Sequence, residues 1–420
     1  MFVGVILFIF RGTNLYSEVQ KLASFSVLKG LFLVGVLQAF YGLLQFIGKY
    51  SSNHNFFAIT GSFDNPAGFA AVLSLLFPIG VYWCIKSKRF EQRLIFFSVG
   101  LVVFLLIISG SRSGLLAVAI SSLIIFAIEF QLLSKIQNLK NLKLYFIPTF
   151  IILFISLFFL FKWKPDSANG RLLIWKVSTE MIKEKPLFGY GYKGFQANYM
   201  DFQAQYFQKN PQSKFKHLAD NIIHPFNEFI KITVNFGICG LLLYLSLLSL
   251  ILWKLFKSKH SLKSILLGCY TSFIILSSFS YPLHYAPIWL LFGHLTFVLF
   301  SAWLPGKKLS LLTRIPIIGV CLLGVSFITF KMNNELKWKD IAVKSFQGKT
   351  KLMLPNYAKL YPNMRHNELF LYNYGAELNV AGQYKESIML LNECLSKYND
   401  YDLQMLLADN YQCRLVKEIL

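Results

Sequence analysis

Long apolar runs, separated by short polar connections, make up most of the chain as far as Phe330. An apolar helix of about 20 residues crosses the roughly 30 Å hydrocarbon layer, so runs near this length predict transmembrane helices. They cover residues 27–47, 66–86, 94–110, 114–130, 144–161, 229–253, 264–281, 287–304 and 314–330. Residues 1–10 are apolar but too short to span, and they lack the basic start and cleavage site of a signal peptide. We interpret them as the end of a further span, which predicts an all-α, polytopic membrane protein with about ten transmembrane helices.

Two segments depart from this pattern and have the composition of soluble protein. Residues 162–226 form the longest polar connection, and the apolar runs stop after Lys331. We therefore predict a transmembrane domain over residues 1–331 and a soluble domain over residues 332–420. Within the long connection, apolar side chains recur at helical spacing from residue 174 to 182, and Pro186 follows them. This predicts an amphipathic helix at the membrane interface, with Trp175 as its anchor.

The soluble tail carries a helical-repeat pattern. Gly375 and Ser387 are small residues at the positions where two antiparallel helices would cross, and residues 382–384 would form the turn between them. The pattern over residues 374–395 resembles a tetratricopeptide repeat. The pattern of the repeat's first helix recurs at 406–411, and residues 335–366 are expected to supply a capping helix pair. An unrelated helical hairpin is the alternative. A tail of this kind could dock the acceptor or a protein partner.

Composition agrees with the bilayer as solvent. The chain is 55% hydrophobic and 15% charged, whereas a soluble domain is about 25% charged. Its mean hydropathy is +0.50. A net charge of +22 would suggest nucleic acid in a soluble protein, but here the positive residues lie mainly in the short connections and in the one long loop. Nucleic acid is therefore not expected as a partner.

The distribution of Lys and Arg predicts the orientation. Connections 86–93, 131–143, 254–263 and 305–314 are rich in positive residues, whereas 48–65, 110–113 and 282–286 hold at most one each. Positive residues in short connections stay on the cytoplasmic side, and long loops largely escape this rule. The connections with few Lys and Arg residues, the loop 162–226 and the tail are therefore predicted to lie outside the cytoplasm.

Some spacings that usually signal a cofactor or metal do not fit their surroundings. Residues 189–194 match GxGxxG, but they follow a predicted helix and no βαβ unit surrounds them, so a dinucleotide site is not expected. Asp400 and Asp402 have the Asp-x-Asp spacing of glycosyltransferases that use nucleotide sugars; between two tail helices, we interpret them as a helix-capping turn. The histidines form no HExxH and no Cys/His pair, which argues against a metal site. Cys394 and Cys413 in the tail could pair or stay free.

The candidate chemistry lies on the predicted external face. Arg112 ends one span in a tight turn, Arg171 begins the amphipathic helix, and His224 lies where the long loop meets the membrane. Each alone has a plainer interpretation, as a snorkelling or solvated arginine or as an ordinary interface histidine. His284, among aromatic residues, is a weaker candidate. The turn 186–191 could offer backbone N–H groups to an anion or merely end the helix, and we favour the second.

Taken together, these residue types point to one class of reaction. Arginine pairs bidentately with phosphate oxygens and keeps its charge. Histidine titrates near neutral pH and suits general-base work. Phosphate-binding residues and one base, with no metal or nucleotide motif, fit transfer from a lipid-linked diphosphate, because the leaving group carries its own activation.

The order of the motifs adds a family resemblance. In sequence they are GSFDNP at 61–66, SRSG at 111–114, Arg171 with Trp175, PLFGYG at 186–191, HPFN at 224–227 and GICG at 237–240. As an ordered set over roughly residues 55–300, they resemble the O-antigen ligase family, which includes O-antigen polymerases and protein O-oligosaccharyltransferases. Two positions depart from the family pattern, because Pro225 stands where Asn commonly follows the histidine and Ala67 replaces the second Asn of Asn-Pro-Asn.

The resemblance implies a mechanism and a location. The donor would be a glycan on undecaprenyl diphosphate at the outer leaflet of the bacterial cytoplasmic (inner) membrane, with lipid A–core as the acceptor. His224 would be the catalytic base, Arg112 and Arg171 would bind the donor diphosphate, and no metal or cofactor is implied. Further candidate substrate contacts are Asn65, Asn227 and His284.

Other functions remain open. The acceptor could be another glycan repeat, as in a polymerase, or a protein Ser/Thr, as in an O-oligosaccharyltransferase. A transporter with a partner-binding tail is the alternative from another class, and it predicts charged residues at mid-bilayer on several spans. Apart from Lys29 and Lys231 near span ends, the spans carry almost none, which favours an enzyme acting at the external surface.

Overall fold

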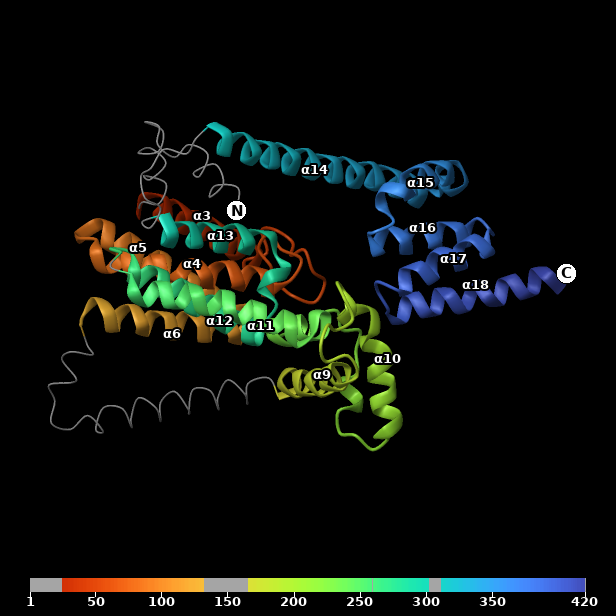
Figure 1. Cartoon of the computed structure of the whole chain (residues 1–420), viewed down its shortest axis with the longest axis horizontal. Helices are drawn as coiled ribbons and strands as arrows, with labels where there is room; N and C mark the ends of the chain where they lie inside the picture. Colours follow the sequence, from red (N-terminus) through yellow and green to blue (C-terminus); the bar gives the residue numbers. More distant parts are fainter. Residues whose placement is uncertain (1–24, 132–164, 259, 302–310, 420) are drawn as a thin grey trace. The chain divides into compact units, whose positions relative to one another are not determined.

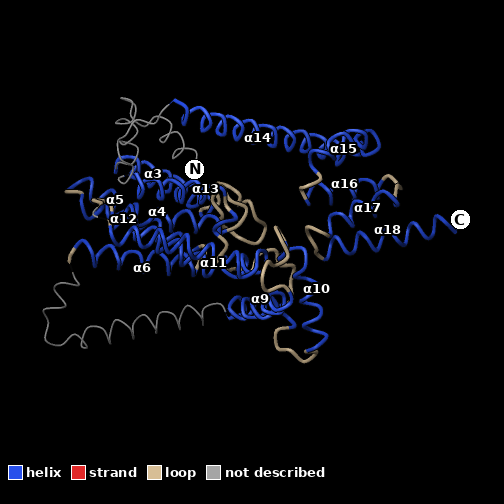
Figure 2. The backbone as a smooth tube through the Cα atoms, in the orientation of Figure 1, coloured by secondary structure: helices blue, strands red, loops and turns tan. Residues whose placement is uncertain are grey.

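The computed structural model describes residues 25–131, 165–258, 260–301 and 311–419. Every regular element within these ranges is a helix, which confirms the all-α prediction, and Figure 2 shows the helices joined by loops. The α-helices, labelled in Figure 1, are α3 (Phe25–Phe46), α4 (Pro66–Lys86), α5 (Arg89–Ile108), α6 (Arg112–Glu129), α9 (Pro165–Glu184), α10 (Gly194–Lys209), α11 (Glu228–Lys257), α12 (Lys263–Phe279), α13 (Ala286–Ser301), α14 (Leu311–Lys344), α15 (Thr350–Met364), α16 (Glu368–Val380), α17 (Tyr384–Leu395) and α18 (Tyr401–Ile419). Short helical segments are η1 (Lys216–Leu218), η2 (Pro282–His284) and η3 (Ser345–Lys349).

The chain is a polytopic membrane protein. Within the described ranges, α3, α4, α5, α6 and α11 are long and apolar enough to cross a bilayer, and α12 and α13 are shorter apolar helices. Each predicted run inside these ranges falls on a helix, and the run 314–330 lies in the first part of the 34-residue α14. The runs 1–10 and 144–161 lie outside the described residues, so the count of ten spans stays a prediction.

Internal contacts divide the chain into two compact units. The bundle unit comprises the described residues of Met1–Ala168, Phe226–Phe229 and Leu242–Arg314. The loop–tail unit comprises those of Asn169–Pro225, Ile230–Leu241 and Ile315–Leu420.

Helix α4 forms the centre of the bundle unit. The side chain of Asn65 caps it by accepting a hydrogen bond from the N–H of Ala67 at 2.9 Å, and Pro66 occupies the first turn, where its missing N–H costs nothing. Nearly all of α4 as far as Trp83 is buried, because α3, α5, α6 and α12 pack around it. An apolar helix without a polar face is expected at the centre of a membrane bundle.

The loop–tail unit contains the predicted helical hairpin, formed by α16 and α17. The hydroxyl of Ser387 donates to the carbonyl of Gly375 at 2.7 Å, and a Cβ on Gly375 would lie 2.6 Å from Leu391 Cδ2. Small residues therefore let the two helices cross closely, and Gly382 takes φ +74° in the turn. The hairpin is confirmed, whereas its membership of the tetratricopeptide family stays a prediction.

Polar contacts join the tail to α10 within this unit. Lys193 forms an ion pair with Glu368. Asn399 donates two hydrogen bonds to α10: its backbone N–H donates to the carbonyl of Gln196 at 3.1 Å, and its side-chain amide donates to Asp201 at 3.1 Å. The long loop and the tail, far apart in sequence, are therefore built as one unit.

The structure accounts for the Asp-x-Asp motif and for the two cysteines of the tail. Asp400 Oδ1 accepts a hydrogen bond from the N–H of Leu403 at 2.8 Å at the start of α18, which confirms the helix-capping interpretation of the Asp-x-Asp motif. Cys394 and Cys413, which could have paired, are both free thiols in this structure.

Candidate functional site

Helix α9 carries Arg171 and Trp175 one turn apart. The helix runs from Pro165 to Glu184 and ends before Pro186, as the apolar spacing predicted. Residues four apart lie on the same helix face, so Arg171 and Trp175 are neighbours on its surface. The buried residues of the helix are Leu173, Ile174, Val177, Ser178 and Met181.

Trp175 connects this face to the segment that carries His224. Its indole N–H donates to the carbonyl of Pro225 at 2.9 Å, and both residues belong to the loop–tail unit. The residue predicted to be a membrane-interface anchor therefore holds the end of the long loop against α9. Arg171 and His224 belong to the same unit, and this bond links the helix of the first to the segment of the second.

His224 is buried, with 6% of its surface exposed. Its Nδ1 lies 3.4 Å from the ammonium nitrogen of Lys231, at the start of α11. An ammonium that donates to Nδ1 leaves the neutral ring protonated on Nε2. Lys231 was not predicted from the sequence to have a role, because it appears there only as a charge near the end of an apolar run.

The phenols of the long loop are poor alternatives as bases. Burial raises the pKa of the Tyr199 hydroxyl, and the carboxylate of Asp220 adds to the effect. Burial also raises the pKa of Tyr190, again with help from a carboxylate, that of Glu184. Both phenols therefore stay protonated near neutral pH, which leaves His224 as the better candidate.

The residues after Pro225 make contacts within the bundle unit. The side-chain amide of Asn227 donates to the carbonyl of Ser278 at 3.0 Å. Glu228, 2% exposed, accepts a hydrogen bond from the N–H of Leu283 at 2.9 Å. The first bond ties the start of α11 to the last turn of α12, and the second ties it to the loop after α12. The side-chain amide of Asn227 is thus used within the protein, and Glu228 was not predicted from the sequence.

Arg112 begins α6 in the bundle unit. Ser111 precedes it as the N-cap, and its hydroxyl accepts a hydrogen bond from the N–H of Gly114 at 3.3 Å. The guanidinium Nη2 of Arg112 donates to the hydroxyl of Ser167 at 3.0 Å. Ser167 lies in the first turn of α9, one helical turn before Arg171.

Asn65 and His284, the weaker candidates, lie in well-defined local structures of the bundle unit. The oxygen of Asn65 is used to cap α4, as described above. His284 is exposed in η2, where its ring lies 5.1 Å from that of Tyr285 and 6.0 Å from that of Tyr281. The ring of Tyr285 also packs edge-on against Phe63 at 5.5 Å, so the loops before α4 and after α12 meet here.

The turn after α9 packs against the first part of α11. The N–H groups of Tyr190 and Gly191 donate to the carbonyls of Val234 and Asn235 at 3.0 and 2.7 Å, and the N–H of Ile238 donates back to Pro186 at 2.8 Å. These N–H groups are therefore used within the protein, which supports the interpretation that the turn ends the helix.

Two glycines permit this close crossing. Gly237 interrupts α11 with φ +66° and ψ −168°, and a Cβ there would lie 2.1 Å from the Leu187 carbonyl. A Cβ on Gly189, at φ +65°, would lie 2.4 Å from the Val234 oxygen. Only glycine accepts both the left-handed backbone and the contact between main chains. The PLFGYG and GICG motifs are thus two sides of one junction.

Comparison with known proteins agrees with this arrangement. Residues 97–245 match the family described as O-antigen ligase. The resemblance to the O-antigen ligase family is confirmed. The matched region contains Arg112, Arg171, His224 and the junction of the two glycine motifs, whereas Asn65 and His284 lie outside it.

Proteins of three Rickettsia species that bear the name “Putative polysaccharide ligase” are also similar. The Rickettsia felis protein is 25% identical over 315 residues, 67% of this chain and 68% of its own length. The Rickettsia bellii protein is 24% identical over 302 residues, 67% of this chain and 66% of its own. The Rickettsia conorii protein is 29% identical over 122 residues, 27% of each chain.

Proposed function

We propose that this chain is a glycan ligase, which moves an oligo- or polysaccharide from undecaprenyl diphosphate to an acceptor hydroxyl, with lipid A–core as the acceptor. The family match and the polysaccharide ligases among its relatives support the general activity. The observation that carries the mechanism is the hydrogen bond from Trp175 to Pro225, because it joins the helix of Arg171 to the segment of His224. In this proposal the phosphate-binding residue Arg171 and the base His224 belong to one site.

The reaction requires one proton transfer and one displacement. His224 takes the proton of the acceptor hydroxyl, and the acceptor oxygen attacks the anomeric carbon of the donor sugar. The bond from that carbon to the diphosphate oxygen breaks, and undecaprenyl diphosphate leaves with the bonding pair. Arg171 and Arg112 neutralise the charge that builds on the leaving oxygen, through bidentate hydrogen bonds. No metal ion or other cofactor is needed in this scheme.

Lys231 fits this scheme as a residue that changes partner. While the ammonium 3.4 Å away donates to Nδ1, the lone pair that would take the acceptor's proton is occupied. The ammonium must therefore release Nδ1 when the substrate binds, so that Nδ1 can act as the base. A diphosphate is the natural new partner, since it attracts the ammonium and frees the base in the same step.

The site is proposed to face the periplasm from the inner membrane. The Lys- and Arg-rich connections support this orientation. The pairing of helix ends in the bundle unit agrees with it: Lys86 and Glu129, beside two connections assigned to the cytoplasm, form an ion pair at 2.6 Å. Asn227, at the start of α11, and Ser278, at the end of α12, lie beside connections assigned to the external side, and they form a hydrogen bond with each other.

Gene deletion separates the acceptors. Loss of all capped lipopolysaccharide on an envelope gel is the result expected for ligation to lipid A–core. Retention of single-repeat caps would indicate a polymerase instead, and unchanged lipids with altered glycoproteins would indicate a protein O-oligosaccharyltransferase. Unchanged glycolipids and glycoproteins together would contradict the proposal and favour the transporter.

A further inference from the structure

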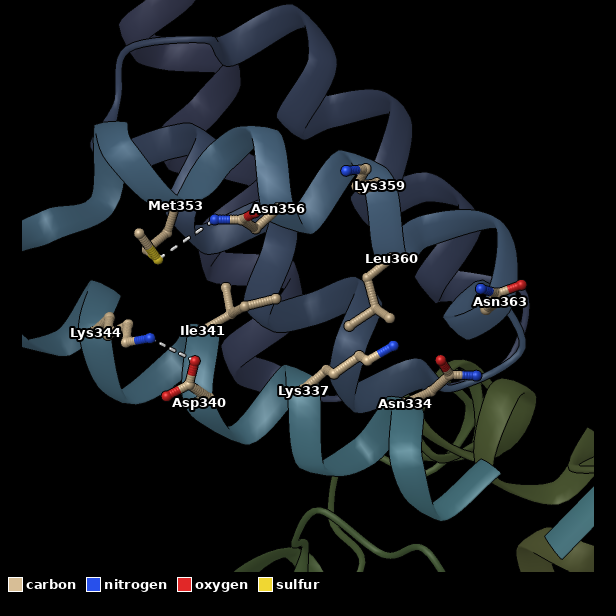
Figure 3. A pocket seen from close by; sticks show the side chains of 10 residues that line it. All are labelled: Asn334, Lys337, Asp340, Ile341, Lys344, Met353, Asn356, Lys359, Leu360 and Asn363. Carbon is tan, nitrogen blue, oxygen red and sulfur yellow. Dashed lines mark hydrogen bonds and ion pairs between the residues drawn. The ribbon is translucent and has the colours of Figure 1, made fainter. Parts of the chain in front are cut away.

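A groove of about 540 Å³ lies in the loop–tail unit, between the last turns of α14 on one side and most of the length of α15 on the other (Figure 3). Its walls show helical spacing, because the lining positions 334, 337, 341 and 344 of α14 and 353, 356, 360 and 363 of α15 each fall on one face. Ten residues of helix are about 15 Å long. The groove is therefore long enough for an extended ligand rather than a single ion.

The two walls are fixed from behind by α16. The indole N–H of Trp338 on α14 and the hydroxyl of Tyr357 on α15 both donate to the side-chain oxygen of Asn373, at 2.9 and 2.7 Å. Ile341 and Leu360, 8% and 6% exposed, provide the apolar floor between the helices. The groove is held in place by this packing and does not need a ligand to form.

The groove carries more positive than negative charge. Lys344 is paired with Asp340 at 2.6 Å. Lys337 extends from α14 towards α15 in Figure 3, and neither it nor Lys359 has a carboxylate partner among the residues that the structure describes. Two cations along one groove attract an anionic ligand.

Asn334 gives a second and independent sign of a ligand. It lines the groove and is 3% exposed, yet its amide nitrogen has no hydrogen-bond acceptor within the described part of the chain. A buried amide N–H without an acceptor is costly, and native proteins rarely keep one without a reason. The amides of Asn356 and Asn363 line the same groove.

We propose that this groove binds a glycan that carries carboxylate or phosphate groups. Lys337 and Lys359 take the anionic groups, and the asparagine amides, Asn334 first, bind sugar oxygens. A concave groove of about 15 Å, with asparagine amides on both sides of the two lysines, suits a linear polyhydroxyl chain better than the flat headgroup surface of a membrane. The proposal rests on the proposed function, and it assigns the tail the task of holding the polysaccharide that is transferred.

The test measures binding to the full-length chain in phosphatidylcholine nanodiscs by calorimetry. The probes are a galacturonic acid hexasaccharide, which is anionic, and maltohexaose, which is neutral and of equal length. We expect the anionic probe to bind at least about tenfold more tightly, and its affinity to fall as salt is raised.

Variants assign that binding to the groove. Lys337→Glu combined with Lys359→Glu should weaken it by about tenfold or more, through lost attraction and new repulsion. Lys351→Glu combined with Lys385→Glu makes the same change in net charge on tail positions that do not line the groove, and should bind as the wild type does. Asn334→Leu should weaken binding without lowering the melting temperature, because no hydrogen bond is lost.

Several results would overturn the proposal. These are equal binding of the two probes, unchanged binding in the groove pair, or equal loss in the control pair. Lysine-dependent binding to phosphatidylglycerol vesicles without binding of the hexasaccharide would make the groove a lipid-headgroup site instead. None of these variants touches His224 or the arginines, so their failure would leave the ligase proposal standing, and failure of the ligase proposal would not alter the binding measurement.

Discussion

The backbone turns sharply between His224 and Asn227. Phe226 takes φ +52°, a left-handed conformation that costs a residue with a Cβ about 1–2 kcal/mol. Its ring lies 5.3 Å from that of Tyr281 in the bundle unit, which helps to offset that cost. Strained backbone of this kind collects at functional sites, where surrounding contacts enforce it. The turn therefore fixes the backbone two residues after His224.

Replacement of this base gives the sharpest test at the residue scale. A general base contributes about 10²- to 10⁴-fold, so His224→Ala should reduce glycan transfer by that factor while protein level and donor binding stay largely intact. His284→Ala is the matched control, since that ring is exposed in a loop outside the family match, and it should keep most of its activity. Normal turnover in His224→Ala, with loss of activity in His284→Ala, would show that the base lies in the other loop.

The arginines are tested by keeping their charge and removing their shape. Arg112→Lys and Arg171→Lys retain a cation but lose the planar fork that binds phosphate bidentately, so each should weaken donor binding and transfer by about tenfold. The change should appear in donor affinity, because the diphosphate is bound before it leaves. Full activity in either variant would show that this arginine does not bind the diphosphate bidentately and is a snorkelling or solvated residue.

Single residues show where the sequence is informative and where it is not. Residue type and motif order identified His224 and the arginines as candidates, whose roles still await test. Lys231 was not recognised as a neighbour of the imidazole, because a contact between α11 and the loop end depends on tertiary structure. Asn65 stays a predicted substrate contact. The structure adds that its side-chain oxygen caps α4, a role that Asn before Pro at a helix start could have indicated.

At the scale of elements, the junction of the 186–191 turn with α11 is the part of the site most sensitive to change. Backbone hydrogen bonds join the two segments, and neither Gly189 nor Gly237 has room for a methyl group. Helix boundaries followed from apolar spacing, since a bilayer requires long apolar helices. The crossing itself did not, because nothing in the local pattern says which loop meets which helix.

Gly237→Ala should destabilise this junction by at least about 2 kcal/mol, through a left-handed backbone and a clash with the Leu187 carbonyl. Thermal unfolding of the purified protein should report a lower midpoint, and transfer should fall with it. Gly100→Ala is the control, because a Cβ there meets nothing within 4 Å in an apolar helix. Equal stability of the two variants would show that the crossing is not tight in solution.

At the scale of the whole molecule, the long loop and the tail form one unit although more than a hundred residues separate them. The ion pair of Lys193 with Glu368 and the contacts of Asn399 join α10 to the tail. The sequence indicated two soluble segments but not their association, because contacts between exposed polar residues leave no periodic pattern. A shared unit also requires the loop and the tail to lie on the same side of the membrane.

Cysteine labelling tests that side directly. A cysteine introduced at Ser213 in the long loop should react with an impermeant thiol reagent in intact cells, whereas one at Ser258 after α11 should react only after lysis. The reason is the positive charge of the connection at 254–263, which retains it in the cytoplasm. Equal labelling at both positions before lysis would overturn the orientation.

The central claim is transfer from a lipid-linked diphosphate by protein side chains alone. The most direct measurement gives purified protein an undecaprenyl-diphosphate-linked oligosaccharide and lipid A–core, in excess EDTA and without nucleotide, and follows the glycolipid product and the released undecaprenyl diphosphate. We expect equal amounts of both products from the wild type and almost none from His224→Ala. A strict need for a divalent ion or a nucleotide, or undiminished product from His224→Ala, would contradict it.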